Sequence, residues 1–432
     1  MQKFQELSQT ELESLYHDLL GKYKNFQEKK LKLDMSRGKP AADQFEISMG
    51  ILDEVNSKSS CLASDGMDCR NYGDFDGIPE CKAIFCDMLE VDPEEIFIFG
   101  NSSLSIMYDA IGKMMLHGVR PGAKPWSRCE KRKFLCPVPG YDRHFSITEC
   151  FGFEMIPIEM TPDGPDMDTV ERLVASDPDI KGIWCVPKYS NPQGITYSDE
   201  TVRRFAQMKT AADDFIIMWD NAYAIHDLYP DQKVPLLNIL EECKKAGDPT
   251  RVMIFASTSK ISFAGAGIGV FACAEEMMAR MKKLLAFQTI GFDKLNMLRH
   301  ARFFKNYEGL LKHMEKHAEL LRPKFKTVLD AFHSQLDGKG IADWIEPLGG
   351  YFISLNVMDQ CAKRVVQLCK EAGVILTAAG ASFPLGKDPR DRNIRIAPTY
   401  PTIEELQQAV SLLCIVIQLA AAEKLLQISP EK

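Results

Sequence analysis

The sequence predicts an α/β protein: a mainly parallel, seven-stranded sheet with helices on both faces, and a smaller α+β domain. From residue 80 to about 275, short apolar runs alternate with helical patterns, which is typical of a parallel sheet covered on both faces. Shorter strand and helix patterns follow a helical stretch that ends near residue 335. With 432 residues the chain is long enough for two domains. We expect an N-terminal arm with part of the small domain at 1–60, a large domain at 61–300 and a small C-terminal domain at 301–432.

The large domain is predicted from its apolar, β-rich runs. Strands are expected at 95–99, 132–138, 154–158, 181–186, 215–219, 251–256 and 268–273. Helical patterns lie between them at 103–116, 141–149, 167–175, 198–211 and 235–246. In such sheets ligands bind at the carboxyl ends of the strands, so polar residues at these ends are the candidates for a functional site.

The remaining segments are assigned to the arm and the small domain. Ser8 and Glu11 have capping-box spacing at the start of a helix expected over 8–30. An extended segment from 31 to 40, a helix at 44–57 and helices over 275–335 follow, with a long linking helix from about 293. Strands at 350–357, 374–376 and 392–397 and helices at 360–372 and 402–424 complete the small domain. We expect the N-terminal segment to pack with it.

Composition excludes several classes of function. A net charge of −8 disfavours nucleic acid as a partner, because phosphate binding needs a basic surface. The 13 cysteines form no CxxC pair and no metal-binding spacing, so we expect no metal, reduced core cysteines and a cytoplasmic location. The apolar stretch at 412–422 is shorter than the ~20 residues that span a bilayer. It predicts a buried terminal helix and no membrane partner.

Lys260 is the first candidate for chemistry. It ends the run Ser257-Thr258-Ser259-Lys260 after one buried strand and precedes a glycine-rich return, 264–269, into another. Desolvation lowers the pKa of an amine in such a place, and a neutral amine can form a Schiff base with a carbonyl. The alternative is a surface lysine at the end of a strand.

Three more strand ends carry polar groups. Asp220 follows the strand at 215–219, with Tyr223 three residues later, and Asn191 lies in the turn after the strand ending at Val186. The run from 100 to 104, Gly-Asn-Ser-Ser-Leu, closes a strand and opens a helix. It fits a phosphate cradle at a helix N-terminus or an ordinary helix cap.

The order of these motifs resembles the fold-type-I pyridoxal-phosphate-dependent enzymes, aminotransferase class I/II, from about residue 30 onward. The motifs are Asn-Pro-x-Gly at 191–194, Asp-x-Ala-Tyr at 220–223 and Ser-x-Ser-Lys at 257–260. Arg-Gly-Lys-Pro at 37–40, the run at 100–104 and Gln-Thr-Ile-Gly at 288–291 look like the MocR-like, or type Ic aspartate aminotransferase, subgroup.

The resemblance implies a catalytic centre that holds pyridoxal 5′-phosphate. Lys260 would bind the cofactor as a Schiff base and move the α-proton of the substrate, and Asp220 would pair with the protonated pyridine nitrogen. Tyr223 and Asn191 would bond the phenolic oxygen. Tyr141 would stack on the ring.

His144 would orient Asp220, the alternative being a satisfied, partly buried histidine. The resemblance assigns the phosphate to Asn101, Ser102, Ser103 and Ser257. Tyr72 would reach the phosphate in the other subunit, which implies a homodimer with its active sites at the subunit interface. Alternatively, Tyr72 packs on its own domain.

Substrate recognition is assigned to arginines. Arg395 lies in an otherwise apolar strand, where a buried guanidinium needs an anion, and the family places the arginine for the α-carboxylate here. A structural salt bridge is the alternative. Asn191 would also face the substrate, and Gly38 would let its loop close. Arg37 could bind a second carboxylate of the substrate. Arg143 and Lys294 are alternative candidates for this role.

The sequence departs from the family's pattern at Ile268, where many relatives carry a phosphate-binding arginine. No basic residue lies between Lys260 and Cys273. Helix and turn amides, or hydroxyls such as that of Ser262, would then meet the phosphate charge.

The resemblance predicts an aminotransferase that exchanges an amino group between an amino acid, with L-aspartate favoured, and a 2-oxo acid, with 2-oxoglutarate favoured, by a ping-pong route. A β-lyase or decarboxylase using the same cofactor is the alternative within the class. A MocR-type regulatory domain is the alternative from another class. A nicotinamide dehydrogenase is disfavoured because GxGxxG after an early strand is missing.

Overall fold

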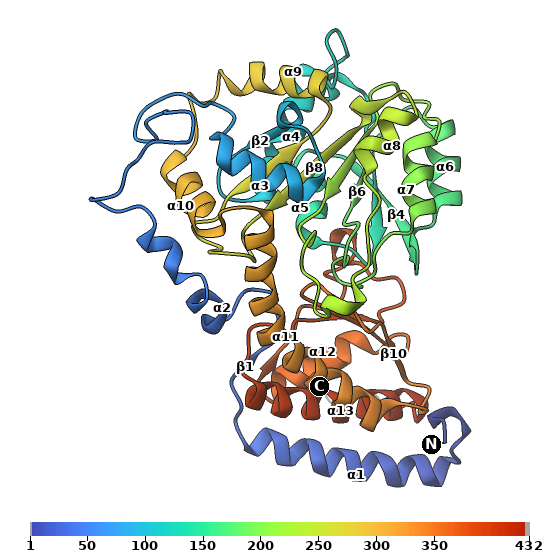
Figure 1. Cartoon of the computed structure of the whole chain (residues 1–432). Coiled ribbons are helices and arrows are strands. Elements are labelled where there is room, and N and C mark those ends of the chain that lie inside the picture. The colour runs from blue at the N-terminus through green and yellow to red at the C-terminus, as the bar shows by residue number, and fades with distance from the viewer. Residues whose placement is uncertain (1, 428–432) are drawn as a thin grey trace.

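The computed structural model describes residues 2–427 and has two bodies, one built on a large sheet and one smaller (Figure 1). The large sheet has the strand order β2-β9-β8-β7-β6-β3-β4-β5. Its strands are β2 (Ile96–Ile98), β3 (Lys133–Val138), β4 (Glu154–Thr161), β5 (Gly164–Pro165), β6 (Ile180–Cys185), β7 (Ile216–Asp220), β8 (Val252–Ser257) and β9 (Gly269–Ala272). All seven predicted strands are present. The eighth, β5, is a two-residue strand that pairs antiparallel with β4.

The sheet is mainly parallel, as predicted. The pairs β3–β4, β3–β6, β6–β7 and β7–β8 are parallel, and β9 runs antiparallel to its neighbours β8 and β2. The chain therefore reverses between β8 and β9, and Lys260 lies in this reversal.

Helices cover both faces because alternate strand residues point to opposite sides. In β7, Ile217 and Trp219 belong to one apolar core, whereas Ile216 and Met218 belong to the other. The first core also takes residues of α3 (Pro79–Leu89), α6 (Met167–Ser176), α7 (Asp199–Gln207), α8 (Ile239–Lys245) and α10 (Lys294–Phe304). The second takes residues of α4 (Ser103–His117), α5 (Asp142–Cys150) and α9 (Glu275–Leu285).

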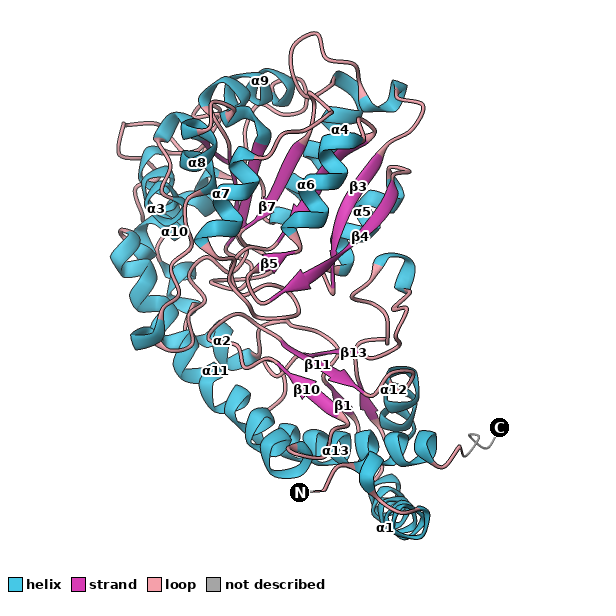
Figure 2. Ribbon diagram, turned by 90° about the vertical axis from the view of Figure 1, so that its right-hand side faces the viewer, coloured by secondary structure: helices cyan, strands magenta, loops and turns pink. Residues whose placement is uncertain are grey.

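The smaller body is α+β. Its three-stranded antiparallel sheet has the order β10 (Ala342–Trp344), β11 (Ile353–Val357) and β13 (Asn393–Ile396). Its helices are α12 (Ala362–Glu371), α13 (Ile403–Leu425) and the end of α11 (Tyr307–Leu336), which runs between the two bodies (Figure 2). The N-terminal segment joins it, as predicted: α1 (Gln9–Glu28) packs on α13, and β1 (Leu33–Asp34) pairs with β12 (Val374–Ile375). The domain boundaries at 60 and 300 stay a prediction.

Two predicted helices differ from the structure. The helix expected from about 293 is two helices, because Lys305 adopts a left-handed conformation (φ 67°) and Asn306 caps α11 by accepting from the amide of Gly309. The helix expected at 44–57 is a short α2 (Ala42–Glu46) followed by a 3₁₀ turn (Met49–Asp53). The segment 31–40 contains the strand β1 and no helix, as predicted, and β10 was not predicted.

α13 is the buried terminal helix that the sequence predicts. Within residues 2–427 it is the one helix long and apolar enough to cross a membrane, and 72% of its most apolar window is buried inside the protein. It packs between α1, α11 and α12, which accounts for its hydrophobicity.

Candidate active site

A cavity of about 220 Å³ lies at the carboxyl ends of β6, β7 and β8. Eight of the predicted site residues line it: Ser102, Ser103, Tyr141, Asn191, Asp220, Tyr223, Ser257 and Lys260. Five lining residues were not predicted as site residues: Leu104, Met107, Val186, Ala222 and Ser259. Ser259 lies inside the Ser-x-Ser-Lys motif, and this motif could have indicated that Ser259 lines the site.

Lys260 offers its amine to this cavity. Its Nζ lies 4.9 Å from the ring centroid of Tyr223 and 5.6 Å from that of Tyr351. Burial lowers the pKa of the Lys260 amine, the nearby Arg395 acts in the same direction, and Asp220 opposes them. The amine is therefore closer to its neutral, nucleophilic form than an exposed lysine.

Asp220 lies on the β7 face that carries the second apolar core and is buried. Its Oδ2 is 2.9 Å from Nε2 of His144, whose ring stacks on Trp184 with centroids 4.3 Å apart. The other oxygen, Oδ1, is buried and has no partner among the described residues. Such an oxygen requires a donor, because an unpartnered buried acceptor costs free energy.

Two tyrosines complete the walls. Tyr141 precedes α5, and burial, with Asp220 and Asp142 nearby, raises the pKa of its hydroxyl to about 12. Burial likewise raises the pKa of Tyr223 well above its ordinary value. Both phenols are therefore protonated at neutral pH and can donate hydrogen bonds.

The N-terminus of α4 forms one end of the cavity. Ser102 is an ordinary N-cap, accepting from the amide of Ser105 at 3.4 Å, and it also lines the cavity with Ser103. The two interpretations of this run are thus compatible. Ser257 donates to Ser259 at 3.1 Å. Asn101 is exposed and is not among the lining residues.

The hydroxyl of Ser262, which was expected to meet the phosphate charge, lies outside the cavity. This hydroxyl is buried, 2.8 Å from Nε2 of His300 and 2.9 Å from Oγ1 of Thr258, and Ser262 is not a lining residue. Ile268, at the position of the family's arginine, is part of an apolar core. Positive partial charge for an anion at this end comes from the amides of α4, supported by the hydroxyls of Ser102, Ser103 and Ser257.

Arg395 lies in β13 of the smaller body and reaches the larger one. Its Nη1 donates to Oδ1 of Asp142 at 3.0 Å and to Oδ1 of Asn191 at 3.3 Å, and its guanidinium lies 4.9 Å from the ring centroid of Phe352. Its Nε is buried without a partner among the described residues. Arg395 thus forms the salt bridge that was the alternative to substrate binding. Its Nε–H remains free to donate a hydrogen bond beside the cavity. Asp142 was not predicted as a site residue, although it adjoins Tyr141.

Gly38 lies against Phe352. A Cβ at this position would approach Cζ of Phe352 to 2.3 Å, so a larger residue would displace the Phe352 ring. Arg37 and Arg143 are exposed, Lys294 is buried, and none of the three lines the cavity. Tyr72 is 71% exposed and lies outside the lining.

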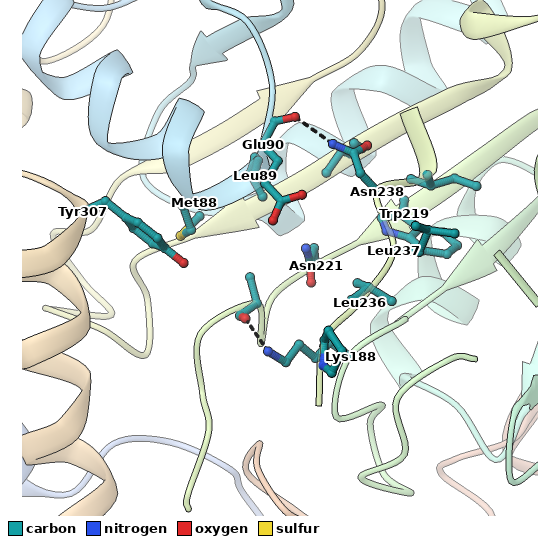
Figure 3. A pocket seen from close by; sticks show the side chains of 14 residues that line it. Met88, Leu89, Glu90, Lys188, Trp219, Asn221, Leu236, Leu237, Asn238 and Tyr307 are labelled. Atoms are coloured by element: carbon teal, nitrogen blue, oxygen red, sulfur yellow. Dashed lines mark hydrogen bonds between the residues drawn. The ribbon is translucent and has the colours of Figure 1, made fainter. Parts of the chain in front are cut away.

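A second cavity, of about 170 Å³, lies behind the turn that follows β7 (Figure 3). Asn221 and Ala224 line it, whereas Ala222 and Tyr223 line the first. Its lysine, Lys188, donates to the carbonyl of Ala224 at 2.9 Å and pairs with Asp227 at 3.2 Å. Because this amine has an anionic partner, Lys260 is the better nucleophile.

Comparison with known proteins confirms the predicted class, an aminotransferase, and its fold. The chain belongs to the aspartate amino-transferase family, which matches residues 7–429. An aspartate aminotransferase of Corynebacterium glutamicum is 45% identical over 410 residues, covering 95% of this chain and 94% of that protein. The resemblance to the MocR-like subgroup stays a prediction.

Solved structures agree with this assignment. The crystal structure of an aspartate transaminase from C. glutamicum superposes with a TM-score of 0.95 at 44% identity, covering 98% of this chain and 99% of that one. The α-aminoadipate aminotransferase of Thermus thermophilus, complexed with N-(5′-phosphopyridoxyl)-L-leucine, has a TM-score of 0.73 at 19% identity and covers 91% and 93%. At that identity the likeness concerns the fold.

Proposed function

We propose that this protein transfers the amino group of L-aspartate to 2-oxoglutarate with pyridoxal 5′-phosphate as cofactor. The observation that carries the proposal is that Lys260, an amine of lowered pKa, and Asp220, a carboxylate with one unpartnered buried oxygen, line one cavity. A ring with a carbonyl at one end and a protonated nitrogen at the other satisfies both groups. The names of the C. glutamicum relatives support aspartate as the amino donor.

The residues present fit this cofactor. Lys260 would attach to its carbonyl, and Asp220, oriented by His144, would bond its ring nitrogen. Tyr223 and Asn191 would bond its phenolic oxygen, and Tyr141 would cover its ring. The N-terminus of α4, with Ser257, would hold its phosphate, Asn101 contributing through its backbone. When bound, the cofactor supplies an electron sink for the substrate's α-carbon.

The protein's own part in the reaction is to orient the substrate and move a proton. Arg395 would bind the α-carboxylate, with its Nε as the free donor, and Asn191 would fix the guanidinium. The amine of Lys260, once displaced by the substrate's amino group, would take the α-proton as a general base. Gly38 and Phe352 would close the site against water, and Arg37, exposed beside Gly38, would read a second carboxylate.

Reduction of the holoenzyme with borohydride, followed by peptide mapping, tests the cofactor assignment: a pyridoxyl adduct on Lys260 is expected. Aspartate added to the holoenzyme should then yield oxaloacetate and pyridoxamine phosphate in a half-reaction. Release of ammonia would instead favour a lyase, and formation of alanine with carbon dioxide would favour a decarboxylase. Binding of aspartate without turnover would favour the regulatory alternative.

Arg395→Lys should raise the KM for aspartate roughly tenfold to a hundredfold, because a lysine loses the bidentate fork and the stacking on Phe352. The visible absorption of the bound cofactor should change little, since Arg395 would touch the substrate and not the ring. Steady-state kinetics and an absorbance scan measure the two effects. Arg203→Lys, an exposed arginine on α7 that does not line the cavity, is the control. An unchanged KM would leave Arg395 with a structural role only.

We also propose a homodimer in which the exposed Tyr72 reaches the phosphate site of the second subunit. Tyr72→Phe should then weaken binding of pyridoxal phosphate about tenfold, the value of one hydrogen bond to a charged group, without altering the monomer's fold. Equilibrium dialysis and light scattering measure affinity and mass. A monomeric holoenzyme with wild-type affinity would refute both statements.

The thirteen free cysteines support a reducing, cytoplasmic location.

A further inference from the structure

Three buried histidines hold the turn that carries Lys260 from behind, outside the cavity. His313 and His317 lie one turn apart on α11, and the Nε2 atom of each is 2.9 Å from the carbonyl oxygen of Ile261, the residue after Lys260. His300 on α10 places Nε2 2.8 Å from Oγ of Ser262. We call these three residues the histidine cluster.

The contacts determine the tautomers of His317 and His300. Nδ1 of His317 accepts from Nε2 of Gln44 at 3.1 Å, so Nε2 of His317 carries the proton and donates to Ile261. Nε2 of His313 lies 2.9 Å from the same carbonyl oxygen and 3.1 Å from Oγ of Ser48. Nδ1 of His300 donates to the carbonyl of Asn296 at 2.8 Å, so its Nε2 accepts from Ser262.

All three rings are neutral at physiological pH. Burial lowers the pKa of His300, His313 and His317 to about 4. The cluster therefore fixes the turn by hydrogen bonds without adding positive charge next to the Lys260 amine. Three apolar side chains would fill the same space at a lower cost in free energy, because burying a polar ring removes its hydrogen bonds to water.

The cluster acts on a short, tightly bonded turn. Within it, the amides of Ile261 and Ser262 both donate to the carbonyl of Thr258 at 2.9 Å. The carbonyl of Ile261 points the opposite way, onto α11. The two histidines lie 2.9 Å from this oxygen and Oγ of Ser48 lies 3.4 Å from it, so the Ile261–Ser262 peptide cannot rotate without losing these contacts.

The same network reaches the segment predicted to close over the substrate. Gln44, four residues after Pro40, is fully buried, accepts from the amide of Ala41 at 3.1 Å and donates to the hydroxyl of Tyr351 at 2.7 Å. The ring of Tyr351 lies 5.6 Å from Nζ of Lys260. Gln44 thus connects His317 with Tyr351 and with Ala41, the residue that follows Pro40.

We infer that His313 and His317 are positioning residues, which hold the main chain at Ile261 so that the Lys260 amine stays aimed at the reacting carbon, and that Gln44 couples this turn to the segment at 37–40. The expected effect on catalysis rests on the proposed function. The expected effect on the main chain at Ile261 does not, because it can be measured in the cofactor-free protein. A misplacement of about 1 Å at a reacting group slows a reaction about a hundredfold, so a change at this distance is measurable.

The test compares His313→Leu and His317→Leu, which remove the donor, with His313→Gln and His317→Gln, whose amide nitrogen can replace Nε2. His333→Leu, on an exposed part of the same helix, is the control. In cofactor-free protein, amide exchange at Ile261 and Ser262 should be about tenfold faster in the leucine variants. The half-reaction with aspartate should slow by about tenfold to a hundredfold with little change in KM. The glutamine variants should restore both.

Unchanged exchange in the leucine variants, or a loss that glutamine does not restore, would overturn the inference. If leucine prevents folding, His313→Asn serves instead, since its shorter amide does not reach Ile261. The proposed function is judged separately by the pyridoxyl adduct on wild-type Lys260. If that adduct is absent, amide exchange in the cofactor-free protein still tests whether the two histidines hold the main chain at Ile261.

Discussion

Replacing Lys260 by alanine should lower transamination by about four orders of magnitude, the upper end of what a positioned proton-transfer group supplies. The variant loses both the attachment point for the cofactor and the base that takes the α-proton. It should purify colourless or hold pyridoxal phosphate without a covalent bond. Turnover of aspartate and mass spectrometry after borohydride treatment measure the two losses.

The chain offers a matched control for this experiment. Lys181, at the amino end of β6, is also buried and pairs with Asp214 at 2.8 Å. Lys181→Met should lower the melting temperature and leave activity per folded molecule intact. If Lys260→Ala kept full activity, Lys260 would have no place in the mechanism, whatever happened to Lys181→Met.

Changing Asp220 to alanine should cost roughly two to three orders of magnitude in kcat, the effect of removing one preorganised polar group from a buried site. The ring nitrogen would lose its anionic partner, and His144 would lose the acceptor 2.9 Å away. Cofactor should remain attached in part, because Lys260 and the N-terminus of α4 are untouched. Absorbance and kcat measured on the same samples separate retention from turnover.

Asp220→Asn separates charge from shape, since it keeps the size of the side chain and one contact to His144. It should lose nearly as much activity as the alanine variant, because an amide cannot hold a proton on the ring nitrogen. Asp214→Asn, at the opposite end of β7, is the control and should affect stability alone. An Asp220→Asn enzyme of wild-type kcat would contradict a charge role for Asp220.

Local patterns predicted the parts of the site that depend on strand ends. β7 and β8 are continuous apolar runs, and in a parallel sheet their carboxyl ends share one edge, so Asp220 and Lys260 had to lie near each other. The cap at Ser102 followed from its position before an amphipathic helix. These features depend on residues close together in sequence.

What the sequence did not predict depends on long-range contacts. Nothing near His313 or His317 indicates that both would bond Ile261, more than fifty residues earlier, because a buried histidine in a helix reads as core. The ion pair of Arg395 with Asp142 joins residues 253 positions apart. The break at Lys305 was missed because a left-handed lysine has no signature in a helical pattern.

The pairing of α1 with α13, and of β1 with β12, bears on how the chain is made. α1 leaves the ribosome some 375 residues before α13 begins, a delay on the order of tens of seconds at ordinary rates of synthesis. During that time α1 lacks the helix against which it packs, and its buried residues Leu12, Leu19 and Tyr23 are not yet covered by α13. The smaller body is therefore complete only once α13 has been synthesised.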